Sequence, residues 1–399
     1  MIDFIASGTI SSPRGFCSGA TRAGIKESAG DKLDLGILFS EAPCAAAAIF
    51  TSNKIKAAPV VLSQQRLKSG RAAVVVMNSG CANAFTGKQG LADAAEMADL
   101  AAGVCGVLSE DVLVASTGVI GQLLPMERLR TGMRRIVLSR EGGHDLARAI
   151  MTTDTVPKEV AARVDGGKFI IGGIAKGAGM IHPELATLLC FLATDAAVNI
   201  DFLRLALRKA ADISFNMVSI DCDTITNDTV LIMANGLAGN AVISQSNGGD
   251  VFQQALNQVC IHLAKSIARD GEGATRLIEV IIRGAASVSD ARLAARAVVS
   301  SPLVKTAVHG NDPNWGRIVA AVGASGVEVV EPKIDLYIGN IDILKSGQLL
   351  PFDKADVIEV LEGNKVPISV NLNLGTATAT AWGCDLSEEY VTINSQYTT

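Results

Sequence analysis

A threonine at the start of an apolar segment is the residue with the greatest reactive potential in this sequence. Residues 175–195 read AKGAGMIHPELATLLCFLATD, so a glycine-rich turn leads through His182-Pro183 into an apolar run whose second residue is Thr187. A hydroxyl becomes an effective nucleophile only when a base removes its proton. A lone threonine on a strand more often serves the sheet, because β-branched residues suit strands. The residues alone therefore favour a structural role for Thr187 and leave a nucleophilic role open.

The pair Thr117-Gly118 follows a predicted strand at residues 111–116. A strand that ends in Thr-Gly can aim a hydroxyl and a backbone N–H at one point, and such converging donors stabilise a developing oxyanion. Glycine is also frequent in ordinary strand-to-loop turns. The residues alone favour the turn, and the oxyanion role stays open.

The remaining reactive side chains show no catalytic or metal-ligating pattern. Cys81 follows the sequence NSG in a predicted turn at residues 78–80, but no base can be identified beside it, and a buried inert cysteine is the commoner case. The eight cysteines include no C-x-x-C pair, and no two histidines have metal-ligand spacing. We therefore predict no metal or other cofactor, and we expect reduced thiols in a cytoplasmic protein.

The composition excludes several classes of protein. With 399 residues, 49% of them hydrophobic and 19% charged, the chain is not disordered. A net charge of −5 and no lysine or arginine run longer than a pair argue against nucleic-acid binding. The longest uncharged stretch, residues 229–249, is interrupted by Asn, Gly and Gln, so no membrane span is expected. The first residues include an acid and no basic region, so no secretory signal is predicted.

Strand-like and helix-like segments alternate along the chain without an internal repeat, and this pattern predicts an α/β or intermixed α+β fold. Apolar spacing and capping residues predict helices at 91–104, 125–135, 201–213, 251–268, 290–298 (capped by Ser289) and 352–361. Apolar runs and alternation predict strands at 71–76, 111–116, 168–174, 186–194, 277–282 and 367–374.

Residues 176–187 resemble the self-cleaving motif of the ornithine acetyltransferase family, also called glutamate N-acetyltransferases. The family pattern is Lys-Gly-Ser-Gly-Met-Ile, then Pro, then Ala-Thr before an apolar strand. It stands here as KGAGMI at 176–181 and PELAT at 183–187. Further matching pieces follow in order over essentially the whole chain: FTSN at 50–53, AAPV at 57–60, NSG at 78–80, STGVIG at 116–121, MTTDT at 151–155, NDT at 227–229, GEGAT at 271–275, DPNWGR at 312–317 and residues 394–399.

The sequence departs from the family pattern at four positions. Ala178 replaces the commoner Ser, Glu184-Leu185 replaces Asn-Met, and Cys81 stands where Asn is usual. Glu184 lies two residues before the bond that the family cleaves, so this departure bears on the rate of cleavage. The Ala-Thr bond and Lys176 are retained.

The resemblance implies layered sheets covered by helices, in the fold of a self-cleaving acyltransferase with a threonine nucleophile. Thr187 would cleave the bond after Ala186 and divide the chain into 1–186, the N-terminal alpha chain, and 187–399, the C-terminal beta chain that begins with the nucleophile. Both pieces would contribute to one core, in a heterotetramer of two copies of each. The freed α-amino group, whose ordinary pKa of about 7.7–8 lies near the working pH, would then serve as the base for the hydroxyl.

The reaction that the resemblance implies is the transfer of acetyl from N-acetylornithine to glutamate in arginine biosynthesis. The acetyl group would be carried on Thr187, without a metal or redox cofactor. Some members of the family also accept acetyl-coenzyme A as donor, and no feature of this sequence decides that point. In this family, Thr117 and Gly118 correspond to the oxyanion donors, and the substrate contacts correspond to Thr153, Lys176, Thr187, Glu272, Asn394 and Thr399.

Two other functions stay open at this point. A related self-cleaving aminopeptidase or amidase would pass the acyl group to water instead of an amine. A non-catalytic binding protein would keep the fold without the cut, and Glu184-Leu185 is the only feature that favours it.

Overall fold

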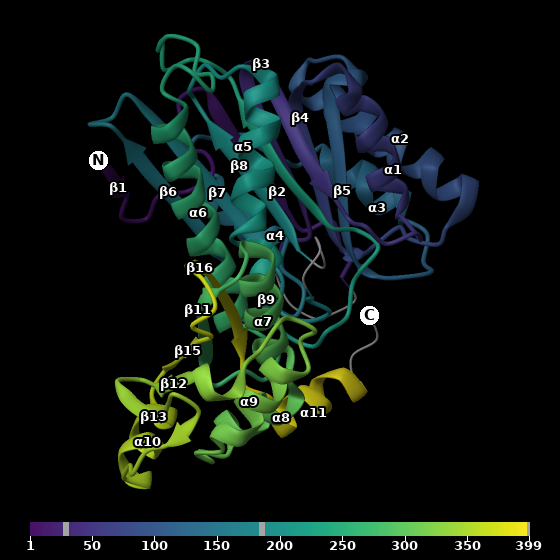
Figure 1. The fold of residues 1–399 in the computed structure, drawn as a ribbon. Coiled ribbons are helices and arrows are strands. Elements are labelled where there is room, and N and C mark those ends of the chain that lie inside the picture. Colours follow the sequence, from purple (N-terminus) through teal and green to yellow (C-terminus); the bar gives the residue numbers. More distant parts are fainter. Residues whose placement is uncertain (27–31, 183–187, 397–399) are drawn as a thin grey trace.

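The computed structural model describes residues 1–26, 32–182 and 188–396. Within these ranges the chain forms 16 strands and 11 α-helices, and the strands make two sheets. Figure 1 shows the first sheet in a larger lobe and the second sheet in a smaller lobe below it. The confirmed prediction is therefore a mixed α/β fold with layered sheets and covering helices.

The first sheet has nine strands among the described residues, in the order β1-β6-β7-β8-β10-β3-β4-β5, with β2 also paired to β3. Its pairs are antiparallel except β8 with β10 and β4 with β5, which are parallel. The strands are β1 (Ile2–Phe4), β2 (Phe16–Thr21), β3 (Leu35–Phe50), β4 (Arg71–Cys81), β5 (Val112–Val119), β6 (Lys158–Val164), β7 (Phe169–Lys176), β8 (Leu189–Thr194) and β10 (Thr229–Ala234).

Two strands that follow residue 187 are inserted between strands that precede it in this sheet. Strands β8 and β10, which follow residue 187, lie between β7 on one side and β3 on the other, and both of those strands precede residue 187. Every residue of β8 and β10 is buried, as expected of a parallel pair at the centre of a sheet that is covered on both faces.

The second sheet has seven strands in the described part of the chain, in the order β14-β13-β12-β15-β11-β16-β9. Its strands are β9 (Val218–Ser219), β11 (Leu277–Ala285), β12 (Asp335–Ile338), β13 (Ile341–Lys345), β14 (Gln348–Leu349), β15 (Lys365–Asn371) and β16 (Ala377–Cys384). Strand β11 is an interior strand, with parallel β15 on one side and antiparallel β16 on the other.

Helices cover both sheets, and one of them connects the lobes. Helix α6 packs on β6 and β7 of the first sheet and also contacts β9, β11 and β16 of the second (Figure 1). The helices are α1 (Ala58–Arg66), α2 (Gly87–Cys105), α3 (Met126–Met133), α4 (Gly143–Ala149), α5 (Ile200–Asp212), α6 (Gly249–Arg269), α7 (Val288–Ser300), α8 (Pro302–His309), α9 (Trp315–Gly323), α10 (Lys354–Glu362) and α11 (Glu388–Gln396). The buried apolar residues of α6 recur every three or four positions, so one face of the helix joins the core shared by the two lobes.

Most predicted helices and strands are confirmed, with two local corrections. The predicted turn at 78–80 is wrong, because these residues continue β4 and pair with residues 116–118 of β5. The predicted cap Ser289 is also wrong, since Ser287 caps α7 by accepting the N–H of Asp290. The predicted run 186–194 is a strand from Leu189 onward, and its residues 186–187 lie outside the described ranges.

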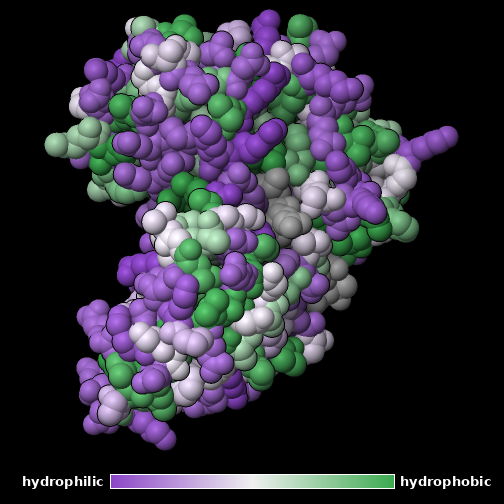
Figure 2. All heavy atoms as spheres, in the orientation of Figure 1, coloured by the Kyte–Doolittle hydropathy of each residue, from purple (hydrophilic) through white to green (hydrophobic). Residues whose placement is uncertain are grey.

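No helix in the described ranges combines the length and the apolar character needed to cross a bilayer. Hydrophilic residues cover much of the visible face of the larger lobe, and hydrophobic residues are more frequent where the lobes meet (Figure 2).

Candidate active site

One pocket brings together every predicted site residue that the structure describes. Its lining includes Thr117, Gly118, Thr153, Lys176, Glu272 and Asn394. The hollow measures about 450 Å³, part of it open to solvent. Ala186, Thr187 and Thr399, which were predicted as the cleavage site, the nucleophile and a substrate contact, lie outside the described residues.

The pocket also contains four residues that the sequence did not single out: Thr152, Gly179, Met180 and Ile225. Thr152 adjoins the predicted Thr153, and Gly179 and Met180 belong to the motif at 176–181, so their neighbours in the sequence offered a signal. Ile225 precedes β10 in a loop that is held by distant residues, since its carbonyl accepts the Thr51 hydroxyl at 2.8 Å, and no sequence pattern marked it.

Lys176 is the buried cation of the pocket. It ends β7, is 5% exposed, and its Nζ donates to Thr117 Oγ1 and to Thr152 Oγ1, both at 3.1 Å. Burial lowers the pKa of Lys176, against the attraction of Asp154 and Asp228. Because an ammonium group can only donate, the Thr117 oxygen is an acceptor in this bond, and the Thr117 hydroxyl proton is left to point at another acceptor.

The backbone of β5 holds Thr117 and Gly118 at the edge of the pocket. Gly118 has φ of +125° and pairs with Gly80 of β4. A Cβ at Gly118 would lie 2.4 Å from the Gly80 carbonyl carbon, so only glycine fits this close approach. Thr117 and Gly118 therefore belong to the end of β5, which pairs in parallel with β4. The alternative of an ordinary strand-to-loop turn is wrong.

A buried group of charges supports Lys176 from behind. Lys158 Nζ lies 2.6 Å from Asp154 Oδ1 and 2.6 Å from Asp270 Oδ2. Asp154 also accepts the N–H of Gly177, the residue after Lys176, at 2.8 Å. Burial alone would raise the pKa of Asp154, but the attraction of Lys158 and Lys176 outweighs it and lowers that pKa to about 2. The carboxylate therefore stays ionised and fixes the backbone beside Lys176.

Asp154→Asn is expected to lower the thermal unfolding midpoint at neutral pH, at a cost of about 3–5 kcal/mol, because it leaves a buried charge group incomplete. A carboxyl whose pKa is lowered by folding stabilises the protein above its ordinary pKa of about 4, and this contribution disappears as the pH falls toward the folded value. The gap in midpoint between variant and wild type should therefore narrow below about pH 4. Scanning calorimetry over a pH series measures this gap.

The matched control is Asp165→Asn. Asp165 pairs with Lys168 at 2.6 Å, but its side chain is 43% exposed, so the change should cost less than about 0.5 kcal/mol. Equal losses in the two variants would refute the supporting role of Asp154.

Glu272 supplies the negative charge of the pocket. It follows α6, is 7% exposed, and accepts Asn394 Nδ2 of α11 at 2.7 Å. The backbone N–H of Glu272 donates to the Ala178 carbonyl at 2.7 Å, which places its carboxylate against Gly179. A Cβ at Gly179 would lie 2.4 Å from Glu272 Oε2. The glycine therefore leaves the space that this carboxylate occupies.

Gly179→Ala is expected to displace the Glu272 carboxylate, since the end of a flexible side chain yields more readily than backbone. The KM for the amino-acid substrate should rise about tenfold, which is the effect of losing one charge-assisted hydrogen bond, with little change in the unfolding midpoint. Steady-state kinetics and calorimetry measure the two effects. Gly103→Ala, a helical position with no heavy atom near the added methyl group, is the control; it should leave KM unchanged and raise the unfolding midpoint slightly, because alanine favours the helix. An unchanged KM in Gly179→Ala would show that Glu272 does not contact the substrate.

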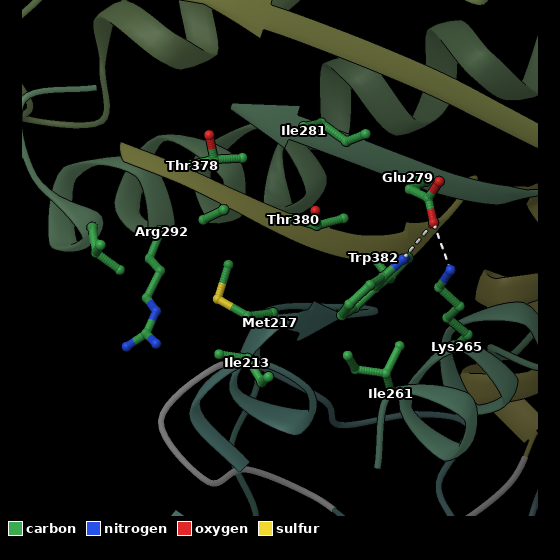
Figure 3. A pocket seen from close by; sticks show the side chains of 12 residues that line it. Ile213, Met217, Ile261, Lys265, Glu279, Ile281, Arg292, Thr378, Thr380 and Trp382 are labelled. Carbon is green, nitrogen blue, oxygen red and sulfur yellow. Dashed lines mark hydrogen bonds and ion pairs between the residues drawn. The ribbon is translucent and has the colours of Figure 1, made fainter. Parts of the chain in front are cut away.

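A larger hollow in the small lobe is also lined by charged groups, Lys265, Arg292 and Glu279, but the acid among them is already paired (Figure 3). It measures about 930 Å³ and lies over β11 and β16, where Trp382 Nε1 donates to Glu279 at 2.8 Å and Lys265 pairs with the same carboxylate at 3.0 Å. Burial would raise the pKa of Glu279, but its bonds to Lys365, Trp382 and Lys265 lower it to about 2. These partners satisfy the carboxylate, so we assign this hollow no chemistry.

The cysteine alternative also finds no support. Cys81 is buried, its thiol donates to the Gln122 carbonyl at 3.3 Å, and burial raises the thiol pKa. A thiol is the less reactive form of cysteine.

No cluster of three or more histidine, cysteine or acidic side chains suited to a metal occurs among the described residues.

A mixed α/β fold with a buried lysine, a buried carboxylate and several hydroxyls around one pocket defines an enzyme for small charged molecules. The model of the ArgJ family matches residues 17–399, and the chain belongs to this family. A relative from Dehalococcoides mccartyi named arginine biosynthesis bifunctional protein ArgJ is 52% identical over 401 residues, covering 100% of this chain and 99% of the relative. The protein of the same name from Symbiobacterium thermophilum is 52% identical, covering 98% and 99%.

A solved structure is also similar. The crystal structure of arginine biosynthesis bifunctional protein ArgJ from Bacillus halodurans has 46% identity and a TM-score of 0.51, covering 52% of this chain and 98% of the solved chain. The solved chain thus corresponds to about half of the present one.

Proposed function

We propose that this protein is a glutamate N-acetyltransferase that carries acetyl on Thr187 from N-acetylornithine to glutamate, in arginine biosynthesis. The observation that supports this most strongly is the pocket itself, in which Lys176, Thr117 and Glu272 meet although they are far apart in the sequence. Membership of the ArgJ family supports the same reaction.

The first step is the cut between Ala186 and Thr187. Thr187 Oγ attacks the Ala186 carbonyl, the peptide C–N bond breaks, and water hydrolyses the resulting ester. When Thr187 later attacks an acetyl group, the freed α-amine accepts the Oγ proton and passes it to the leaving amine. When glutamate attacks the acetyl ester, the α-amine accepts a proton from the glutamate amine and returns it to Oγ. The solved relative supports the cut, because its chain corresponds to only about half of this one although 98% of it is matched. Strands before and after residue 187 pair side by side, which supports an assembly in which both pieces stay together.

The second step moves the acetyl group. Thr187 Oγ attacks the acetyl carbonyl of N-acetylornithine, the C–N bond breaks, and ornithine leaves as the amine. The amine of glutamate then attacks the acetyl ester, the C–O bond breaks, and N-acetylglutamate leaves. Negative charge develops on the carbonyl oxygen in both attacks, and the free proton of the Thr117 hydroxyl is available to stabilise it.

The charges of the pocket match those of the substrates. An amino acid carries a carboxylate and an ammonium group, and Lys176 and Glu272 provide the two opposite charges. Thr153 and Asn394 add neutral hydrogen-bonding groups. We include Thr399 among the substrate contacts of the same site. We further propose that the two pieces assemble as a heterotetramer of two copies of each and that the protein is cytoplasmic. Acetyl-coenzyme A as a second donor fits the word "bifunctional" in the names of the relatives.

Incubation of the purified protein with N-acetylornithine and glutamate tests the proposal. Transfer should yield N-acetylglutamate and ornithine in equal amounts, measured by mass spectrometry. Free acetate without N-acetylglutamate would indicate a hydrolase, and no product from a folded protein would indicate a binding protein.

A further inference from the structure

Asp221 binds the chain just before the proposed cut. It lies between β9 and β10, and its carboxylate accepts the backbone N–H of Met180 at 2.5 Å and that of Ile181 at 2.8 Å. The Ile181 carbonyl in turn accepts the N–H of Ile220 at 2.9 Å. The same carbonyl also accepts the N–H of Asp221 at 3.4 Å, so residues 180–181 are held by four hydrogen bonds to residues 220–221.

The backbone that Asp221 holds is strained. Met180 has φ of +56°, a conformation that is unfavourable for a long side chain without other support. The two N–H bonds to Asp221 provide that support, and the complete burial of the Ile181 side chain adds to it. The chain therefore leaves residue 181 in a defined direction.

The same carboxylate is bound from a second side. Tyr390 of α11 donates its hydroxyl to Asp221 Oδ2 at 3.3 Å, and the N–H of Asp223 donates to Oδ1 at 3.3 Å. Helix α11 also carries Asn394, which binds Glu272 in the pocket. Asp221 therefore connects the segment before the cut to the C-terminal helix that lines the pocket.

We infer that Asp221 is a positioning residue for self-cleavage: it fixes residues 180–181, from which the chain continues to the cut. This inference rests on the proposed function. The segment between Ile181 and Leu189 is fixed at its far end by β8, which pairs with both β7 and β10. Asp221 fixes its near end, and fixing both ends reduces the conformations that the reacting groups must sample.

Asp221→Asn removes one of the two acceptors and places an amide NH₂ opposite a backbone N–H. We expect the first-order rate of cutting to fall about 100-fold, the effect of misplacing reacting groups by about 1 Å. Cell-free synthesis followed by intact mass analysis over time measures this rate. Asp221→Ser is the second variant and replaces Asp221→Asn if that protein does not fold. It removes the carboxylate acceptors without placing an amide NH₂ opposite the backbone, and it should slow cutting to the same degree.

Asp335→Asn is the matched control. Asp335 is also buried and accepts a backbone N–H, that of Ser346, at 2.8 Å, but it lies in the second sheet among residues that do not line the pocket. We expect this variant to lose thermal stability without slower cutting, and the kcat of Asp221→Asn, once cut, to fall less than its cutting rate.

Three results separate the inference from the proposed function. A wild-type chain that never cuts would refute the proposed cleavage itself. Normal cutting in a folded Asp221→Asn or Asp221→Ser would overturn only the positioning role. Equal slowing in Asp221→Asn and Asp335→Asn, in proportion to their loss of stability, would also overturn it.

Discussion

Thr187→Ala is expected to give a single uncut chain with no measurable acetyl transfer. The alanine has no hydroxyl to attack the Ala186 carbonyl or the acetyl group, so one change removes both steps. Strand β8 begins at Leu189, so the change should leave the sheet and the unfolding midpoint nearly unaffected. Intact mass before and after incubation with N-acetylornithine reports both the cut and any acetyl adduct.

Thr187→Ser is the control for this experiment. It keeps the hydroxyl and should still cut and still transfer acetyl, at reduced rates. A Thr187→Ala protein that is severed between residues 186 and 187, or that still gains an acetyl group, would contradict the proposed mechanism.

Thr117→Val is expected to lower kcat by about 10²–10³-fold, the cost of removing one oxyanion donor. Valine has nearly the shape of threonine but no hydroxyl, so it removes the proton that Lys176 leaves free and changes the packing of β5 little. Because the lost bond is strongest in the transition state, KM should change much less than kcat. Steady-state kinetics on fully cut protein makes the measurement, and Thr117→Ser should recover most of the rate.

Thr194→Val separates this effect from the loss of any buried hydroxyl. Thr194 is fully buried on β8 and donates to the Ile170 carbonyl at 2.7 Å. Its loss should lower stability and leave kcat unchanged. If Thr117→Val behaves like Thr194→Val, Thr117 is a structural residue.

The sequence predicted those elements whose own pattern determines them. Helix α6 shows its buried face at steps of three and four residues, and the prediction at 251–268 lies within Gly249–Arg269. Strand β3 was missed, because its alanine-rich second half has low strand propensity and is held by pairing with β10. The error at 78–80 has the same cause, since pairing with β5 outweighs the turn preference of Asn-Ser-Gly.

The candidate site was harder to predict than the fold when each residue was considered alone. On pattern alone Lys176 is a loop lysine and Thr117 a turn residue, and only the family motif placed them together before the structure was known. What the segment at 176–187 does not contain is its environment: Asp154 behind Lys176 belongs to the matching piece at 151–155, and Asp221 behind Met180 belongs to no matching piece. Such contacts depend on the fold and leave no local pattern.

The insertion of β8 and β10 between earlier strands of the first sheet determines whether the protein can refold after it has been cut. Strands β8 and β10 fill a gap between strands that precede residue 187, so the pieces of a cut protein inherit an arrangement built by one continuous chain. After complete denaturation, recovery would require two separate polypeptides to meet and interdigitate, a second-order process in competition with aggregation. The mature enzyme would then persist through slow unfolding, whereas its uncut precursor could regain its structure unimolecularly.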